Sequence, residues 1–292
     1  MKSHITIKTF SPTKFSAPII GFQSKHTRGI NLGFIKKNRS DEKFIPARLN
    51  FGVTREKMTY QATLESLNLP QVKKILSKYS PNKISTVTVL RETLGCRIGE
   101  ALDSVGIKNH YGDAFIGATH IKDKGPIRTA YLYENIEGLV NNGLWVIAES
   151  FCTGRNLFAT LNSLLAKLNP KEILFIAPIA SRRAIEYIDK VLHKHKVDAT
   201  YITWGALFGV DDKTLYDMPW GHKDTEVIDE RDRDVFIKMY DKTLCMGGDF
   251  GNNYFCPSLA LTLYKKQLKE QNITPKIPTA KQIRKIYSKD EL

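Results

Sequence analysis

The sequence contains few cysteines and no long apolar segment. Its four cysteines, Cys96, Cys152, Cys245 and Cys256, stand far apart and form no Cys-x-x-Cys pair, so neither a zinc site nor a small disulfide scaffold is expected. No apolar run approaches the ~20 residues of a membrane-spanning helix. The first fifteen residues also lack the apolar stretch of a secretory signal. We therefore expect a reduced, intracellular protein, most simply cytoplasmic, without membrane partners.

Acidic residues are scarce in the first 57 residues. This segment has twelve Lys or Arg against Asp41, Glu42 and Glu56, which gives +9 of the chain's net charge of +14. Such a segment attracts polyanions, including RNA. The segment shows no sustained helical or strand periodicity. It is therefore predicted to be a basic N-terminal arm or extension at residues 1–57, ahead of a domain at residues 58–292. The alternatives are a solvated arm, an organelle transit segment, or an arm that packs across a partner subunit.

Beyond residue 58, apolar runs typical of buried strands alternate with helical patterns. Strands are predicted at 84–90, 114–121, 129–133, 144–148, 172–177 and 199–203, and helices at 59–78, 98–105, 156–168 and 182–194. A turn at Lys124-Gly125-Pro126 joins the second and third strands. The alternation predicts an α/β fold with a central, mostly parallel sheet flanked by helices. Ligands of such sheets bind beyond the carboxyl ends of the strands.

One strand–turn–helix segment has the residues that suit a phosphate. Glu149 follows the apolar strand and is placed to accept hydrogen bonds from ribose hydroxyls. The loop into the next helix reads Cys152, Thr153, Gly154, Arg155 and Asn156. Gly154 lets the backbone approach a ligand, Thr153 and Asn156 supply donors, Arg155 supplies positive charge, and Cys152 is a small apolar filler. A helix start favours an anion, although a plain capped turn is the alternative.

Residues 144–157 resemble the phosphoribosyl-pyrophosphate motif of type I phosphoribosyltransferases. Three more segments resemble the uracil phosphoribosyltransferase branch, in the same order along the chain. Residues 89–95 resemble its pyrophosphate loop, residues 116–123 its strand ending in Arg-Asp, and residues 248–255 the loop that closes over the base. The resemblance covers roughly residues 84–203 and 245–256. It implies the phosphoribosyltransferase variant of the α/β fold, with an insertion at about 204–244 that forms a hood over the base.

The resemblance also implies a reaction and its partners. Phosphoribosyl would pass from phosphoribosyl pyrophosphate, carrying Mg²⁺, to a uracil-like nucleobase in pyrimidine salvage, with release of pyrophosphate. No dedicated metal site on the protein is expected. The chain is expected to form a homodimer or a higher homo-oligomer. Glu149 would bind the ribose hydroxyls, Arg91 with Lys122 the pyrophosphate, and Asp249 would orient the base or hold a magnesium-bound water. The remaining loop residues expected to contact the ligand are Gly247, Gly248 and Phe250.

Some positions depart from the family's pattern. Ala148 occupies the first acidic position of the motif, Glu92-Thr93 replaces Ala-Gly, and Asn252-Asn253 replaces Asp-Arg. A carboxylate at residue 92 would repel pyrophosphate unless it points away or meets a cation. These departures favour a second hypothesis, a non-catalytic nucleotide-sensing or RNA-binding protein on the same fold.

The insertion at 204–244 carries an aromatic and a histidine around a tight turn. Trp220 and His222 either form a lid that stacks on a base, or Trp220 anchors a surface loop. Mixed charges at residues 229–234 predict a solvated helix start. The other histidines show no ligand spacing and are expected at the surface: His4, His26, His110, His193 and His195.

Overall fold

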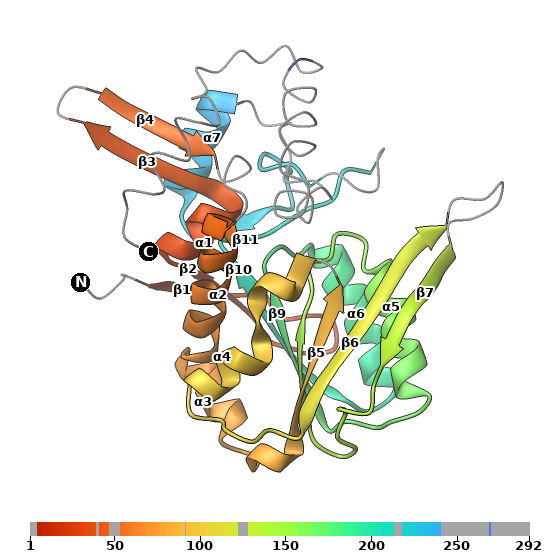
Figure 1. The fold of residues 1–292 in the computed structure, drawn as a ribbon. Coiled ribbons are helices and arrows are strands. Elements are labelled where there is room, and N and C mark those ends of the chain that lie inside the picture. The colour runs from red at the N-terminus through yellow and green to blue at the C-terminus, as the bar shows by residue number, and fades with distance from the viewer. Residues whose placement is uncertain are drawn as a thin grey trace.

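The chain forms an eight-stranded sheet covered by helices (Figure 1). The computed structural model describes residues 5–38, 41–46, 53–90, 92–121, 128–212, 218–240 and 269. The strand order is β1-β2-β10-β9-β8-β5-β6-β7. The bounds are β1 Thr6–Phe10, β2 Ile19–Gln23, β5 Ile84–Leu90, β6 Gly112–Ile121, β7 Arg128–Asn135, β8 Leu144–Ala148, β9 Glu172–Ala177 and β10 Asp198–Trp204. The predicted class, a mostly parallel sheet flanked by helices, is confirmed.

Six neighbouring strands, from β2 to β6 in the sheet order, run parallel. The predicted strands 84–90, 144–148, 172–177 and 199–203 are adjacent within this set, and Trp145 of β8 pairs with Ile173 of β9. Every residue of β8 and β9 is buried. Continuous apolar runs are expected for strands covered on both faces, and this pattern made the centre of the sheet predictable.

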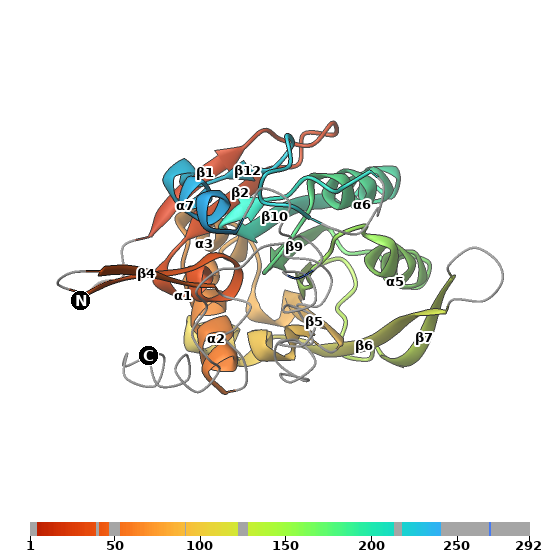
Figure 2. The same ribbon diagram turned by 90° about the horizontal axis from the view of Figure 1, so that it is seen from above.

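Helices cover both faces, as the view from above shows (Figure 2). On one face lie α5 (Arg155–Leu165) and α6 (Arg182–Lys194), whose Leu161 and Ile185 share a core with Phe175. On the other lie α2 (Val53–Leu67), α3 (Pro70–Leu76) and α4 (Ile98–Ser104). The segment predicted to be helical at 59–78 forms two helices instead of one. Pro70 begins α3, and Leu69 before it has ψ 138°, a backbone that the helix cannot continue through.

The first two strands were not predicted. β2 pairs in parallel with β10, with Ile20 opposite Ile202, and β1 pairs antiparallel with β2. All five residues of β2 are buried. Residues 6–10 and 19–23 of the predicted arm therefore belong to the main sheet.

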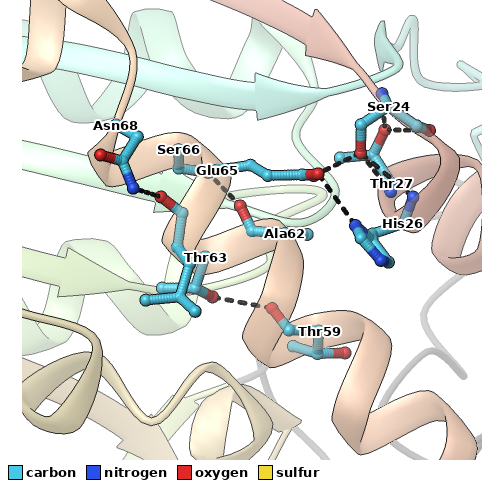
Figure 3. A network of polar contacts seen from close by, with 10 residues as sticks. Ser24, His26, Thr27, Thr59, Ala62, Thr63, Glu65, Ser66 and Asn68 are labelled. Carbon is cyan, nitrogen blue, oxygen red and sulfur yellow. Dashed lines mark hydrogen bonds and ion pairs between the residues drawn. The ribbon is translucent and has the colours of Figure 1, made fainter. Parts of the chain in front are cut away.

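A polar network fixes the turn after β2 to α2 (Figure 3). Ser24 caps the short helix α1 (Lys25–Thr27) and its hydroxyl donates to Glu65 Oε2 at 2.5 Å. His26 Nδ1 lies 2.9 Å from Glu65 Oε1, and the imidazole is buried. The expectation of a surface position for His26 was therefore wrong, because its partner is an acid on a helix 39 residues further along. His193 and His195 are exposed as expected, and His4 lies outside the described residues.

Three further pairs of strands are antiparallel. β6 and β7 pair antiparallel, as predicted for 114–121 and 129–133, while the turn at residues 124–126 lies outside the described part. β3 (Gly33–Asn38) pairs with β4 (Asp41–Pro46), and β11 (Ala206–Leu207) with β12 (Glu226–Val227). α7 (Glu230–Tyr240) begins where mixed charges predicted a helix. Among the described helices, none has the length and apolar character needed to cross a membrane.

Candidate functional site

The candidate site begins where β8 leaves the centre of the sheet. Its last residue, Ala148, is fully buried, and Glu149, which follows, is half-buried. The Glu149 backbone N–H donates to the Ile176 carbonyl of β9 at 3.2 Å. Since β5, β9 and β10 run parallel to β8, their carboxyl ends share one edge of the sheet, the upper edge in Figure 1. Glu149 thus stands at the edge where ligands of such sheets bind.

The loop after Glu149 is clamped to the connection between β9 and α6. The Phe151 N–H donates to the Ile179 carbonyl at 3.0 Å, and the Ser181 N–H donates to the Phe151 carbonyl at 3.1 Å. The Ser181 hydroxyl donates to the Cys152 carbonyl and accepts from the Ala184 N–H at 3.0 Å, which caps α6. One side chain therefore closes the start of α6 and holds the loop before α5.

Gly154 turns the chain into α5. Its φ of +73° lies in the left-handed region, and a Cβ at this position would meet the Cα, Cβ and carbonyl oxygen of Ala184 at 3.3 Å. Both features favour glycine. The Cβ direction faces α6, so the physical need for this glycine comes from backbone conformation and helix packing. The close approach of a ligand to Gly154, which the sequence predicts, stays a prediction.

The start of α5 is open toward an anion. Gly154 has no side chain to cap the helix, and the first turn of α5 contains no acidic residue. The first helical bond runs from the Phe158 N–H to the Gly154 carbonyl at 2.7 Å. Arg155 is exposed, whereas Thr153 and Asn156 are half-buried. The absence of acids, the helix dipole and a neighbouring guanidinium together favour a phosphate.

Two serines belong to this site that the sequence did not reveal. The Ser150 hydroxyl, directly after Glu149, is buried and has no hydrogen-bond partner among the described residues. Buried hydroxyls are usually paired, so Ser150 is a free donor or acceptor next to the loop. Ser181 is the clamp described above. The Ser-Arg-Arg sequence at 181–183 predicts only a helix cap. No sequence pattern predicts that Ser181 bonds the Cys152 carbonyl.

The structure brings together one of the predicted sets. Glu149 and the loop residues share a single turn, and Cys152 packs half-buried against the hydrophobic core, as a filler would. The other predicted site residues lie outside the described residues: Arg91, Lys122, Gly247, Gly248, Asp249 and Phe250. The strands that lead to two of them are described, since β5 ends at Leu90 and β6 at Ile121.

Trp220 in the segment after β10 is an anchor. Its side chain is 1% exposed and meets the ring of Phe208 edge-on at 4.9 Å. His222 Nδ1 accepts from the Asp224 N–H at 3.1 Å, which closes the turn. A ring buried in the core cannot stack on a base, so of the two readings of this turn, the anchored loop is correct.

No family model matches the sequence, and no curated protein is significantly similar to it. Several solved structures are similar over part of the chain. The AQ2163 protein of Aquifex aeolicus is 17% identical, over 55% of this chain and 78% of that one, with a TM-score of 0.41. Adenine phosphoribosyltransferase of Trypanosoma brucei is 8% identical, over 68% and 87%, with a TM-score of 0.40. Hypoxanthine-guanine phosphoribosyltransferase of L. donovani is 18% identical, over 50% and 77%, with a TM-score of 0.35. Similarities of this size do not identify a function.

Proposed function

We propose that this chain binds the 5′-phosphate of a ribose phosphate at the turn after β8, as part of a phosphoribosyltransferase reaction. The observation that carries the proposal is the start of α5, which has no acid and no side-chain cap and directly follows the half-buried Glu149 at the ligand edge of the sheet. The resemblance of residues 144–157 to the phosphoribosyl-pyrophosphate motif supports the same assignment.

In this proposal the loop and the carboxylate take different parts of the ligand. The 5′-phosphate would lie on the N–H groups of residues 153–156, beside Arg155. Glu149 would accept hydrogen bonds from the ribose hydroxyls. Arg91 and Lys122 would bind the departing pyrophosphate, and Asp249 with its neighbouring loop residues would face the base. The acceptor would be uracil-like by resemblance, and the working state a homo-oligomer.

The reaction exchanges one bond at C1 of the ribose for another. The C1–O bond to pyrophosphate breaks, the pyrophosphate leaves with the bonding electrons, and a C1–N bond forms to the base, which loses the proton of that nitrogen to the departing pyrophosphate or to solvent. Positive charge develops on the sugar in the transition state. The carboxylate of Glu149 would stabilise this charge, and cations would stabilise the leaving group. Mg²⁺ would arrive with the pyrophosphate ligand. Among the described residues, no three His, Cys, Asp or Glu side chains gather to hold a metal ion.

One observation favours the second candidate function, a nucleotide-binding protein without turnover. Ala148 is 0% exposed and packs in the core that contains Ile176 and Leu174. A carboxylate cannot replace Ala148 without burying a charge, so the chain presents one acid where the family's motif has two. Binding of the ribose phosphate is common to both candidates, and only transfer distinguishes them.

Two measurements test the proposal in sequence. Calorimetric titration of ribose 5-phosphate into the full chain should give saturable binding. A turnover assay with labelled phosphoribosyl pyrophosphate and a panel of bases then separates enzyme from sensor. For an enzyme, Glu149→Gln should lower turnover far more than it lowers affinity for ribose 5-phosphate, because the positive charge that the carboxylate would stabilise develops on the sugar only in the transition state. If the parent chain does not bind ribose 5-phosphate at all, both candidates fail.

A further inference from the structure

A groove of about 620 Å³ runs along the outer side of α6, from the loop after β1 to the start of α5. Four cationic side chains line it: Lys14, Arg155, Arg183 and Lys190. They come from three separate segments of the chain. None of the four forms an ion pair with any residue that the structure describes.

The one acid that lines the groove has contacts outside the four cationic side chains. Glu186 accepts a hydrogen bond from the Lys14 backbone N–H at 3.2 Å, and Arg182 Nη1, whose guanidinium also bonds Glu226, lies 3.8 Å from Glu186 Oε1. Four cations against one acid leave the lining with a net positive charge. Arg155 and Arg183 also stand in the first turns of α5 and α6, where a cation opposes the helix dipole. Such an arrangement is unfavourable in the free protein and becomes favourable when an anion enters the groove.

Two aromatic rings are exposed among these cations. Tyr187 is 40% exposed and stacks on Phe158 of α5, with ring centroids 4.6 Å apart. Phe15 is 37% exposed and stacks on His193, also at 4.6 Å. Each ring is held from one side by its neighbour. Rings positioned between cations provide the stacking surfaces that bind bases of single strands.

The loop that carries Lys14 and Phe15 is fixed to α6. The Thr13 hydroxyl donates to the buried carboxylate of Asp189, and the Ala17 N–H donates to the Thr13 hydroxyl oxygen at 2.9 Å. Lys14 and Phe15 are thus held against the helix, and the groove exists before any ligand binds. A preformed site loses less conformational entropy on binding.

We propose that this groove binds single-stranded nucleic acid, with the backbone phosphates on the four cations and bases on Tyr187 and Phe15. Arg183 and Lys190 are seven residues apart on one helix, which separates them by about 10 Å along its axis. The positive charge is therefore spread along a line. A mononucleotide has one base and would stack on only one of the two rings, whereas a strand can stack a base on each. The proposal does not depend on phosphoribosyl transfer.

The test measures binding of a fluorescently labelled twelve-nucleotide uridine strand to the full chain by anisotropy, over a series of salt concentrations. The decisive variant is the double substitution Arg183→Gln with Lys190→Gln, because neither residue belongs to the turn after β8. It should bind about tenfold or more weakly. The slope of log affinity against log salt should flatten by about 1.4, at about 0.7 per cation lost on a single strand. Tyr187→Ala should weaken binding about fivefold or more.

Two controls separate the groove from general effects. Lys194→Gln removes an equivalent exposed charge from the same helix, outside the groove, and should stay within about twofold of the parent. Arg183→Lys with Lys190→Arg keeps the charge and should retain most of the affinity. Ribose 5-phosphate binding should not change in the double Gln variant, so failure here and failure of the proposed function are distinguishable.

Three results would overturn the proposal. One is the absence of saturable binding of the strand by the parent chain at low salt. Another is equal affinity of the double Gln variant and Lys194→Gln. The third is displacement of the strand by ATP at concentrations comparable to that of the strand, since the groove would then be a mononucleotide site.

Discussion

Two connections leave the sheet at the same edge and were both expected to hold phosphates, yet they are built differently. After β8 the chain turns at Gly154, φ +73°, and enters α5 at once. After β5 it passes through a 3-10 helix, Glu92–Cys96, and reaches α4 only at Arg97, φ +47°. There the Thr93 hydroxyl donates to the Val89 carbonyl at 2.5 Å and closes the turn on itself.

The described cations of the two connections, Arg97 and Arg155, also differ. Arg97 donates to Glu100 at 2.5 Å and lies over the ring of Tyr60 at 4.5 Å. The hydrogen bond to Glu100 raises the pKa of the Arg97 guanidinium above its usual range. Arg155 has no ion-pair partner among the described residues. Among the described residues, the charge of Arg97 is therefore already used within its own connection, whereas the charge of Arg155 is not paired.

Gly154→Asp should have the largest effect. The side chain would be directed at Ala184 in a left-handed backbone, and a negative charge would stand at the helix start, so ribose 5-phosphate binding should be abolished. Gly154→Ala should lower the free energy of unfolding by about 1–3 kcal/mol. Gly106→Ala is the matched control for backbone strain without a packing clash, because Gly106 has φ +95° with nothing within 4 Å of its Cβ position. If Gly154→Asp binds as tightly as the parent in calorimetry, the loop is only a turn.

Arg155→Ala contrasts the free cation with the paired one. Loss of a charge-assisted contact costs about 1.5–3 kcal/mol, so ribose 5-phosphate should bind about tenfold or more weakly. Arg97→Ala should leave this affinity unchanged, because the charge of Arg97 already serves Glu100. Calorimetric titration of ribose 5-phosphate into both folded variants measures the two affinities. Equal losses of affinity in Arg155→Ala and Arg97→Ala would show that the two connections do not differ as anion sites.

Ser181→Ala should loosen the clamp that holds the open connection in place. The variant loses the cap of α6 and the hydrogen bond to Cys152, so the free energy of unfolding in urea should fall by about 1–2 kcal/mol. Ser181→Thr keeps the hydroxyl and should recover most of the stability. An unchanged urea midpoint in Ser181→Ala would show that the backbone bonds of Phe151 suffice.

Thr153→Val should have the smallest effect, about 1 kcal/mol of ribose 5-phosphate affinity, because one neutral donor is lost in a nearly isosteric change. Thr93→Val, in the closed connection, should lower stability but not this affinity, since its hydroxyl is committed to Val89. An affinity loss in Thr93→Val as large as in Thr153→Val would place the ligand between both connections.

The sequence was sufficient where neighbours in the fold are also close in the chain. β8, α5 and β9 follow one another, and their apolar runs and helical face predicted both the elements and the position of Glu149 at the strand end. β2 was missed because it is short, contains Gly21 and finds its partner β10 about 180 residues away. The role of Ser181 depends on two loops meeting, which hydrophobic periodicity does not report.

The pairing of β2 with β10 also sets an order of events during synthesis. Ile19 has its partner at Tyr201, so β1 and β2 cannot enter the sheet until the chain has been synthesised past β10, which ends at Trp204. A contact across such a separation is slow to form, because a long loop must close before the contact contributes any stability. Until then the apolar residues of β2 and the exposed edge of β10 are without their partners. The strands made first thus complete the sheet last.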